Sequence, residues 1–448
     1  MTHATTHRVP IGAEAGRPVG RAVGWLALLG GVFFLSYGAA NELAARQSDV
    51  ASIVFDWERN IPFLEWTILP YWSIDLLYAL SFFLCATRAE LDRHAFRLLT
   101  AQAVAIACFL LFPLQVSLTR PETSGVTGFL FDLLAVFDRP YNQAPSLHMA
   151  LLVVLWALYA KRLPARFVVA VNVGGGLVAV SVLTTYQHHF VDLPTGFALG
   201  MFCLWLWPED GPKPLANVTL ARDGGRRRLA AIYLAAALVL AAAATFLGGV
   251  WLWLFWPALS LALVAGFYAA IGVPGFQKGA DGRLSLPARW LLAPYLAGAW
   301  LNSRAWTWRC RRPVRIAGFV WLGRLPGAED ETTDTFATVI DLSAELGRRF
   351  DVPRYLSLPM LDLVVPTPEQ LIGVARAIEA SRRRGAVLVA CALGYGRSAA
   401  ALATWLVASG RVPDVDAAVD RLRAGGRSVA LSPAWRRAIE RAAREGLG

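Results

Sequence analysis

Two sets of residues in this chain combine side chains that can transfer a phosphoryl group. The first set lies in segments 138–148 and 187–192, which hold three of the six histidines, His148, His188 and His189. The second set is the segment 391–398, in which a cysteine, two glycines, an arginine and a serine follow one another closely. Imidazole and thiolate groups both attack phosphorus, so each set is a candidate for covalent catalysis.

The histidine set contains a carboxylate at a useful spacing. Asp192 stands four residues after His188, and on a helix this spacing brings the carboxylate to the same face, where it can hold one ring nitrogen. An imidazole that titrates near neutrality serves as a nucleophile or as a general acid. Phosphate oxygens would find partners in the guanidinium of Arg120 or Arg139, and in Ser146 at the start of a helix.

The motifs P-S-L-H at 145–148 and H-x-x-x-D at 188–192 resemble the type-2 phosphatidic acid phosphatase superfamily over roughly residues 65–210. The resemblance implies that His188 is the nucleophile and forms a phosphohistidine. It also implies that His148 protonates the leaving group and that Asp192 orients His188. No metal or other cofactor is expected.

This sequence departs from that superfamily at three positions. No lysine stands seven residues before Arg139 or Arg120, Leu147 replaces a glycine, and Val182 replaces an arginine. The variant D-x-P-x-N-x-x-P-S-L-H, whose asparagine is Asn142, is similar to the branch related to inositol phosphorylceramide synthases, which transfer a headgroup to a lipid alcohol. Hydrolysis and headgroup transfer therefore both remain open for this site, as does an inactive membrane anchor.

The cysteine set lies between a predicted strand, 386–390, and a predicted helix, 397–409. A loop of this length, here with Gly394 and Gly396, can wrap its backbone N–H groups around a phosphate in front of the helix N-terminus. The same dipoles and Arg397 would favour the thiolate of Cys391. Arg397 would bind two phosphate oxygens, and Ser398 would hydrogen-bond the sulfur.

One carboxylate, Asp362, lies in an apolar segment about thirty residues before the cysteine. Apolar surroundings keep a carboxyl group protonated, so that it can give its proton to the leaving oxygen. With segments 321–324 and 339–342 ahead of it, the stretch 313–446 resembles the dual-specificity phosphatases. That resemblance implies Cys391 as nucleophile, Asp362 as general acid and Arg397 as phosphate clamp. The loop between Cys391 and Arg397 has no basic residue, which favours a lipid monophosphate or a phosphoprotein over a multiply phosphorylated substrate.

The composition indicates a membrane protein, because 56% of the residues are hydrophobic and only 17% are charged. The net charge of +11 does not indicate nucleic-acid binding, since the arginines lie in short loops without a ladder of basic and aromatic residues. The five cysteines show no paired spacing, which favours free thiols. Eight apolar segments are long enough to be predicted as membrane spans: 22–41, 66–87, 98–117, 144–160, 167–185, 193–207, 229–247 and 250–272.

The basic residues predict the orientation of these spans. One side carries fourteen: Arg8, Arg17, Arg21, Arg88, Arg93, Arg97, Lys161, Arg162, Arg166, Lys213, Arg222, Arg226, Arg227 and Arg228. The other side carries four: Arg46, Arg59, Arg120 and Arg139. Both chain ends are therefore expected in the cytoplasm of a bacterial-type inner (plasma) membrane, with the histidine set open to the opposite side.

These patterns predict a multi-pass α-helical membrane domain of about eight spans followed by a cytoplasmic α/β domain like the dual-specificity phosphatases. The predicted parts are a tail (1–21), the membrane domain (22–272), a linker with a surface-lying helix (273–312) and the phosphatase-like domain (313–446). The linker's apolar stretch 290–301 is too short to cross; if it crossed, the last domain would change sides. The expected partners are a phosphorylated lipid and the bilayer, and nothing in the pattern indicates an oligomeric state.

Overall fold

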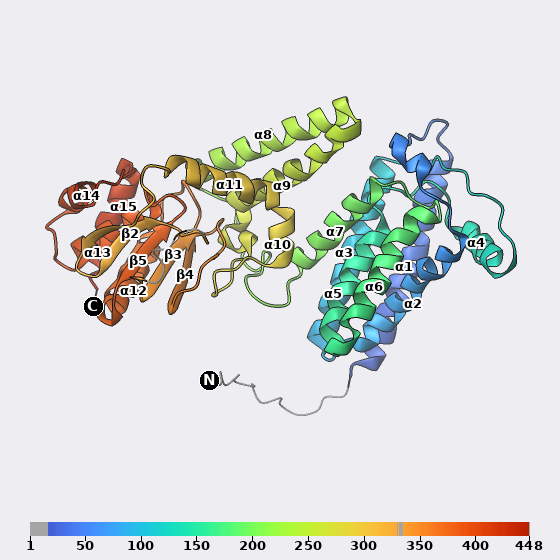
Figure 1. Ribbon diagram of the computed structural model, residues 1–448, viewed down its shortest axis with the longest axis horizontal. Helices are drawn as coiled ribbons and strands as arrows, with labels where there is room; N and C mark the ends of the chain where they lie inside the picture. Colours follow the sequence, from blue (N-terminus) through green and yellow to red (C-terminus); the bar gives the residue numbers. More distant parts are fainter. Residues whose placement is uncertain (1–16, 329, 331–334, 448) are drawn as a thin grey trace. The chain divides into compact units, whose positions relative to one another are not determined.

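The computed structural model describes residues 17–328, 330 and 335–447 (Figure 1). Residues 1–16 of the predicted tail, with Arg8, lie outside the described residues. Internal contacts divide the chain into two units, Met1–Glu209 and Asp210–Gly448. The last part of the predicted membrane domain, residues 210–272, therefore belongs to the same unit as the α/β domain.

The first unit is built from apolar helices, and two of them carry the histidine set at their starts. The two helices pack closely against each other at Gly196 and Gly200 of the second one, since a Cβ on Gly200 would meet the Ala150 carbonyl oxygen of the first at 2.9 Å. Small residues permit such backbone approach between helices in membranes. The helices are α1 (Val19–Ala45), α2 (Ile68–Leu84), α3 (Arg88–Leu111), α4 (Gly125–Phe137), α5 (Leu147–Arg162), α6 (Val168–Thr184) and α7 (Asp192–Leu206).

Within the described residues, six helical segments, instead of the eight predicted, are long and apolar enough to cross a membrane. Their mean hydropathy runs from 1.4 to 2.3. The predicted spans 144–160 and 193–207 form α5 and α7, of 16 and 15 residues. The side chain of Ser146 caps α5 by accepting from the Met149 N–H, so that the helix begins inside the apolar run and is short. The 13-residue helix α4 was not predicted.

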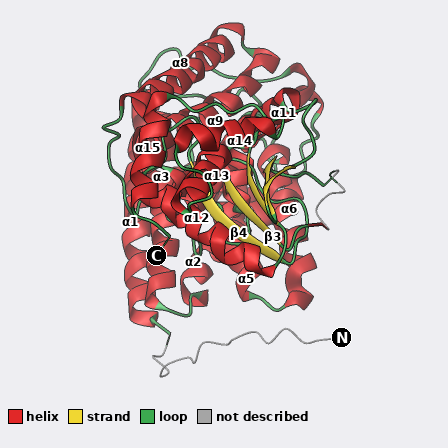
Figure 2. Cartoon of the chain, turned by 90° about the vertical axis from the view of Figure 1, so that its left-hand side faces the viewer, coloured by secondary structure: helices red, strands yellow, loops and turns green. Residues whose placement is uncertain are grey.

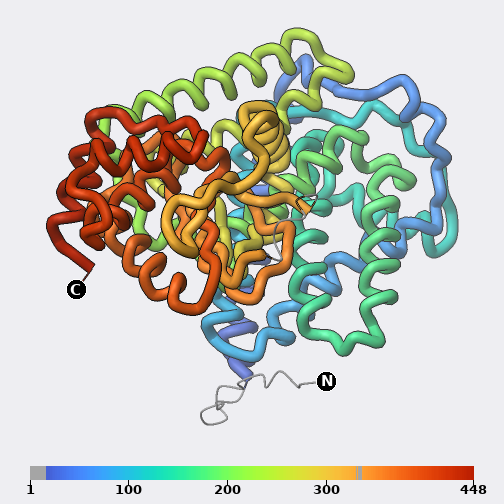
Figure 3. Tube along the Cα trace, turned by 60° about the vertical axis from the view of Figure 1, so that its left-hand side comes forward, coloured from blue at the N-terminus to red at the C-terminus, as the bar shows by residue number. Residues whose placement is uncertain are grey.

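The second unit begins with a helical hairpin. α8 (Gly224–Leu247) turns through Gly248 and Gly249, whose φ angles of 61° and 52° favour glycine. The second arm of the hairpin is continuous in the trace (Figure 3). It comprises the 3-10 segment η4 (Gly249–Leu254), α9 (Phe255–Gly266) and the π-helical turn η5 (Phe267–Ile271). The hairpin exposes large apolar side chains along its length, for example Leu238, Phe246 and Val250.

A five-stranded sheet forms the centre of the α/β domain (Figure 2). Its order is β1-β2-β5-β3-β4, and all neighbours are parallel except β1 and β2. The first two strands form a hairpin, because Gly318 turns the chain at a φ of 52°. The strands are β1 (Val314–Ala317), β2 (Val320–Arg324), β3 (Thr338–Ser343), β4 (Arg354–Met360) and β5 (Val387–Cys391).

The sheet is covered on both faces, as is usual for parallel strands. Residues of the strands alternate between two apolar clusters, one shared with the last four helices and the other with Ala299 and Trp300 of α11. The helices are α10 (Leu286–Leu291) and α11 (Ala293–Trp306) before the sheet, and α12 (Pro368–Ser381), α13 (Arg397–Ala408), α14 (Val415–Ala424) and α15 (Pro433–Arg444) within the domain.

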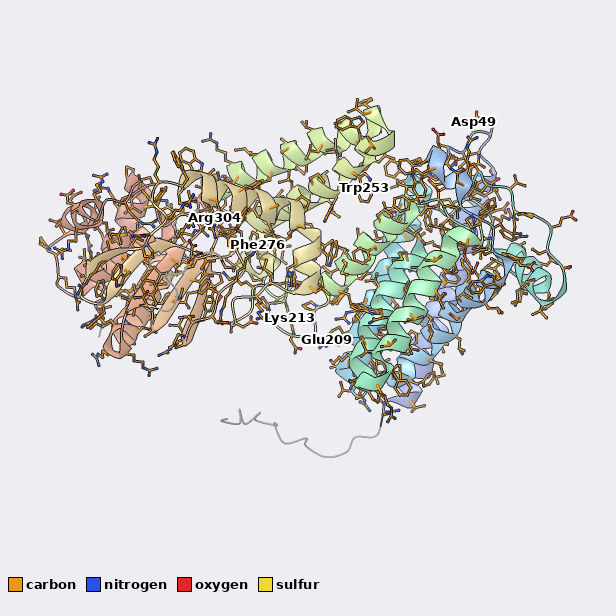
Figure 4. All side chains as sticks on the ribbon, in the orientation of Figure 1. Asp49, Glu209, Lys213, Trp253, Phe276 and Arg304 are labelled. Atoms are coloured by element: carbon orange, nitrogen blue, oxygen red, sulfur yellow. The ribbon has the colours of Figure 1, made fainter. Side chains whose placement is uncertain are left out.

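The predicted linker 273–312 is packed onto the α/β domain. Lys278 is 4% exposed; its ammonium group is ion-paired with Asp341 on β3 and donates to the Leu346 carbonyl at 2.7 Å. Phe276, labelled in Figure 4, packs its ring against Phe267 of η5 at 5.0 Å between centroids. The hairpin, the linker and the sheet therefore form one continuous structure.

Candidate active sites

The cysteine loop joins the central strand β5 to α13. Cys391 is the last residue of β5, and its sulfur accepts from the Gly394 N–H at 3.2 Å. The Ser398 hydroxyl lies 3.2 Å from the same sulfur. Gly394 has a φ of +81°, and a Cβ there would lie 2.7 Å from the Gly323 backbone. The loop thus needs glycine at position 394, whereas a Cβ on Gly396 would meet only ordinary contacts, the nearest at 3.7 Å.

Arg397 opens α13 and is 1% exposed. Its two terminal nitrogens donate to the Glu345 carboxylate at 2.6 and 2.9 Å, and one donates to the Met360 carbonyl at 2.9 Å. Its Nε is buried without a hydrogen-bond partner among the described residues. An unsatisfied buried N–H is costly, and this donor is available to an incoming phosphate oxygen.

Asp362 follows β4 and lies beside the same guanidinium, with Oδ1 2.9 Å from an Arg397 terminal nitrogen. Its side chain is 31% exposed. Burial raises the pKa of Asp362; the charge of Glu345 acts in the same direction, and Arg397 opposes the shift. A raised pKa retains the proton on a carboxyl group that can act as a general acid.

Glu345 was not predicted as a site residue, although it lies at the centre of this cluster. It follows β3 and is 3% exposed. Burial disfavours its charge, but the ion pair and hydrogen bonds with Arg397 outweigh burial and lower its pKa. An acidic residue two positions after a fully buried strand is the signal in the sequence that would have identified it. Cys391, Glu345 and Asp362 thus follow the carboxyl ends of three adjacent strands, which is where α/β sheets place their ligands.

The loop is braced from outside by neighbouring segments. Arg427, 2% exposed, donates to the carbonyls of Leu393 at 3.1 Å and Cys310 at 2.9 Å. The Ser303 hydroxyl of α11 donates to the Ala392 carbonyl at 2.5 Å. These contacts engage the carbonyls of Ala392 and Leu393, while the Gly394 N–H faces the sulfur.

The first unit brings together the histidine set. Asp192 opens α7, and His188 Nδ1–H donates to its carboxylate at 3.2 Å. With that proton on Nδ1, a neutral ring carries its lone pair on Nε2, 3.3 Å from the Ser146 hydroxyl. His148, the second residue of α5, lies with its ring centroid 6.1 Å from that of His188. His188 is thus oriented with Nε2 as the nucleophilic atom.

Of the predicted phosphate-binding residues of this unit, Ser146 lies beside His188, whereas the other three have partners outside the histidine set. Arg139 pairs with Glu42 at 2.7 Å, and Arg120 stacks over the Phe131 ring at 4.6 Å. Asn142 is buried and donates to the Tyr37 carbonyl at 3.1 Å. Among the described residues, no lysine or arginine side chain hydrogen-bonds or ion-pairs with His148, His188 or Asp192.

The segment that carries His188 is held by a buried pair that was not predicted. His189 Nδ1–H donates to the Glu58 carboxylate at 3.2 Å, and its Nε2 accepts from the Ser117 N–H at 2.9 Å. Glu58, 1% exposed, also accepts from the Phe190 N–H at 2.8 Å. These contacts fix the turn before α7, so His189 and Glu58 position His188.

A carboxylate also lies behind His148. The His148 ring stacks on Tyr71 at 4.2 Å, and Tyr71 and Tyr37 donate to Asp138 at 3.5 and 2.7 Å.

No group of three or more His, Cys, Asp or Glu side chains within the described ranges is arranged to hold a metal ion. The expectation that neither site uses a metal therefore stays a prediction from the two resemblances.

Comparison with known proteins gives matches only among solved structures: no family model matches the chain, and no curated protein matches it. The chain is similar to the crystal structure of Tk-PTP in the active form, with 25% identity over 30% of this chain and 96% of that one, at a TM-score of 0.27. It is also similar to human DUSP28, with 22% identity over 30% and 96% of the two chains, at a TM-score of 0.27.

A third similar structure is PTPMT1 in complex with PI(5)P, with 19% identity over 30% of this chain and 95% of that one, at a TM-score of 0.25. These structures are phosphatases of the dual-specificity and PTP type. The resemblance of the helical half to type-2 phosphatidic acid phosphatases stays a prediction.

Proposed function

We propose that this protein is a membrane phosphatase for phosphorylated lipids, with a cysteine site that works through a phosphocysteine. The observation that carries the proposal is the convergence of Cys391, Arg397 and Asp362 at the ends of adjacent strands, with Arg397 Nε unpaired. A nucleophile, an anion-binding guanidinium and a carboxyl group with a raised pKa are together able to cleave a phosphate monoester through a covalent intermediate.

The reaction at this site takes two steps. The Cys391 thiolate forms a bond to phosphorus while the bond from phosphorus to the ester oxygen breaks, and Asp362 gives its proton to that oxygen. Water then attacks the phosphocysteine, the Asp362 carboxylate takes a proton from the water, and the sulfur leaves with its electron pair as inorganic phosphate forms. Arg397 and the loop N–H groups stabilise the charge on the phosphoryl oxygens in both steps, and Ser398 stabilises the departing sulfur.

The proposed location is a bacterial-type inner membrane, with both chain ends in the cytoplasm. Six segments of sufficient length and hydropathy support membrane insertion, and the bias of fourteen basic residues against four supports the orientation. The cysteine site belongs to the same unit as the hairpin, whose two arms are among these segments. Membrane insertion of the hairpin would raise the effective concentration of the site for lipid headgroups.

A lipid monophosphate is the proposed substrate, since the loop itself contains no basic residue. The alternative substrate is a phosphoprotein.

A second, extracytoplasmic site is proposed at His188. Its orientation by Asp192 and the position of His148 favour phosphoryl transfer through a phosphohistidine. Because the sequence variant with Asn142 and Leu147 is similar to the headgroup-transferring branch, transfer of a phosphorylated headgroup to a lipid alcohol is an equal candidate to hydrolysis. If this unit is inactive, it is an anchor for the cysteine phosphatase.

The proposal is tested by trapping the covalent intermediates. The full-length protein is mixed with phosphatidic acid carrying a labelled phosphate, denatured within milliseconds and digested, and the labelled peptides are identified by mass spectrometry. Label on the peptide that contains Cys391, absent in Cys391→Ser, is the expected result. Turnover without label at Cys391 would overturn the cysteine mechanism, and label at His188 would support the second site.

A further inference from the structure

The segment that carries the general acid is in an unusual conformation. Leu363, directly after Asp362, has a φ of +57°, a region in which a bulky side chain without special support is rare. Its side chain is 67% exposed, so packing of the leucine does not supply that support. Residues held in this region persist only where neighbours fix them.

The helical hairpin supplies a contact to this peptide. The Tyr268 hydroxyl, on the π-helical turn η5, donates to the backbone carbonyl of Asp362 at 3.1 Å. That carbonyl belongs to the peptide between Asp362 and Leu363, and the N–H of the same peptide, on Leu363, hydrogen-bonds to the Asp362 carboxyl group. A single hydrogen bond from the hairpin therefore acts on the backbone that aims the general acid.

Tyr268 is itself held firmly by both helices of the hairpin. It is 1% exposed, and its ring packs against Tyr233 of α8 at 5.4 Å between centroids. Arg226 at the start of α8 donates to the carbonyls of Tyr268 at 3.1 Å and Phe267 at 3.4 Å. The hydroxyl group is thus fixed by the hairpin and not by the phosphatase-like fold.

We propose that Tyr268 is a positioning residue of the cysteine site, through which the hairpin α8–α9 holds the Asp362–Leu363 peptide and so aims the general acid. The inference rests on the proposed cysteine chemistry and extends it: the hairpin is part of the catalytic apparatus and not only a tether. The phosphatase-like fold then works at full rate only when the hairpin is formed beside it.

The test uses the dependence of the rate on the leaving group. A general acid matters most for an alkoxide leaving group and little for a stable phenolate. The full-length protein and its Tyr268→Phe variant, which keeps the ring but lacks the hydroxyl, are assayed on dioctanoyl phosphatidic acid and on p-nitrophenyl phosphate. We expect kcat to fall about fivefold to tenfold on the lipid and less than about twofold on the aryl ester, in line with the loss of one hydrogen bond. Tyr233→Phe, in the same aromatic cluster, is the control and should change kcat on neither substrate.

A double-mutant cycle separates positioning from general destabilisation. In an Asp362→Asn background, which has no proton to give, Tyr268→Phe should cause no further loss on the lipid. Equal losses on both substrates, or the same loss with and without Asp362, would overturn the positioning role. If Cys391→Ser abolishes turnover while Tyr268→Phe changes neither substrate, this inference fails and the proposed function stands. If Cys391→Ser leaves turnover intact, both fail.

Discussion

The cysteine and histidine clusters differ in how they are equipped to bind a phosphate. Each places a candidate nucleophile shortly before a helix, Cys391 at the end of β5 before α13 and His188 on the turn before α7, and each has an acidic residue nearby. In the cysteine cluster the guanidinium of Arg397 is buried inside the site. In the histidine cluster the expected arginines are engaged with Glu42 and Phe131. Both clusters place a candidate nucleophile beside a carboxylate, but among the described residues only the cysteine cluster contains its own cation.

The largest expected effect is at Asp192. Asp192→Asn removes the charge that fixes the His188 tautomer and stabilises its protonated form, and we expect histidine-site activity to fall about 10³- to 10⁴-fold. The measurement is turnover of a lipid phosphate or headgroup donor in a Cys391→Ser background. Asp56→Asn, at an exposed position in the same unit, is the control. Full activity in Asp192→Asn would show that the histidine cluster is not a catalytic site.

A smaller but still large effect is expected at Arg397. Arg397→Lys keeps a positive charge but loses the planar fork that matches phosphate oxygens, so cysteine-site kcat should fall about 10²- to 10³-fold. Steady-state rates on p-nitrophenyl phosphate in a His188→Ala background measure it. Rates within a few-fold of the parent would show that Arg397 is structural and does not bind the phosphate.

Glu345 should affect stability as well as rate. Glu345→Gln breaks a buried ion pair, and we expect the free energy of unfolding to fall by about 3 kcal/mol at neutral pH. Because the folded pKa of Glu345 is lowered, its stabilisation is present above the ordinary carboxyl pKa and is lost as the pH falls through the lowered value. The difference between wild type and variant should therefore shrink below about pH 4.

Denaturation of the full chain followed by tryptophan fluorescence measures this difference. Asp351→Asn is the control, because that carboxylate pairs with Arg348 at the surface and should cause no measurable change. A difference that is independent of pH would contradict the ion pair as the source of the stability.

The smallest effect is expected at Arg139. Its guanidinium and its partner Glu42 are both half exposed, so Arg139→Ala should change histidine-site turnover by less than about twofold. Kinetics on the same lipid substrates provide the measurement. A loss of 10²-fold would mean that Arg139 leaves Glu42 to bind phosphate, which would remove the contrast between the two clusters.

The sequence predicts the local parts of this protein well. The strand–loop–helix around Cys391 follows from a short-range pattern. His188 and Asp192 also meet, but through a turn at residues 188–191 and not through the helix that the spacing argument assumed. The helical length of the apolar runs was less predictable. Ser146 caps α5, so the predicted span 144–160 forms a helix that begins at Leu147 and ends at Arg162, with 16 residues and therefore shorter than the candidate spans.

The contacts between distant segments could not be predicted from such patterns. Glu345 meets Arg397 across 52 positions of the chain, and Tyr268 meets the Asp362 carbonyl across 94. Neither pairing leaves a periodic signal, because each depends on which strands are neighbours and on how the hairpin packs. Arg120 and Arg139 were predicted as phosphate ligands from their guanidinium groups. Their partners in the structure, Phe131 and Glu42, depend on the fold.

The central claim is that one chain carries two separate phosphate-handling sites. The most direct measurement assays the purified full-length protein, Cys391→Ser and His188→Ala on one panel of lipid phosphates. Loss of one substrate in the first variant and of a different substrate in the second is the result that this account predicts. If Cys391→Ser removes all activity and His188→Ala removes none, the helical unit is an anchor and the claim of two sites is contradicted.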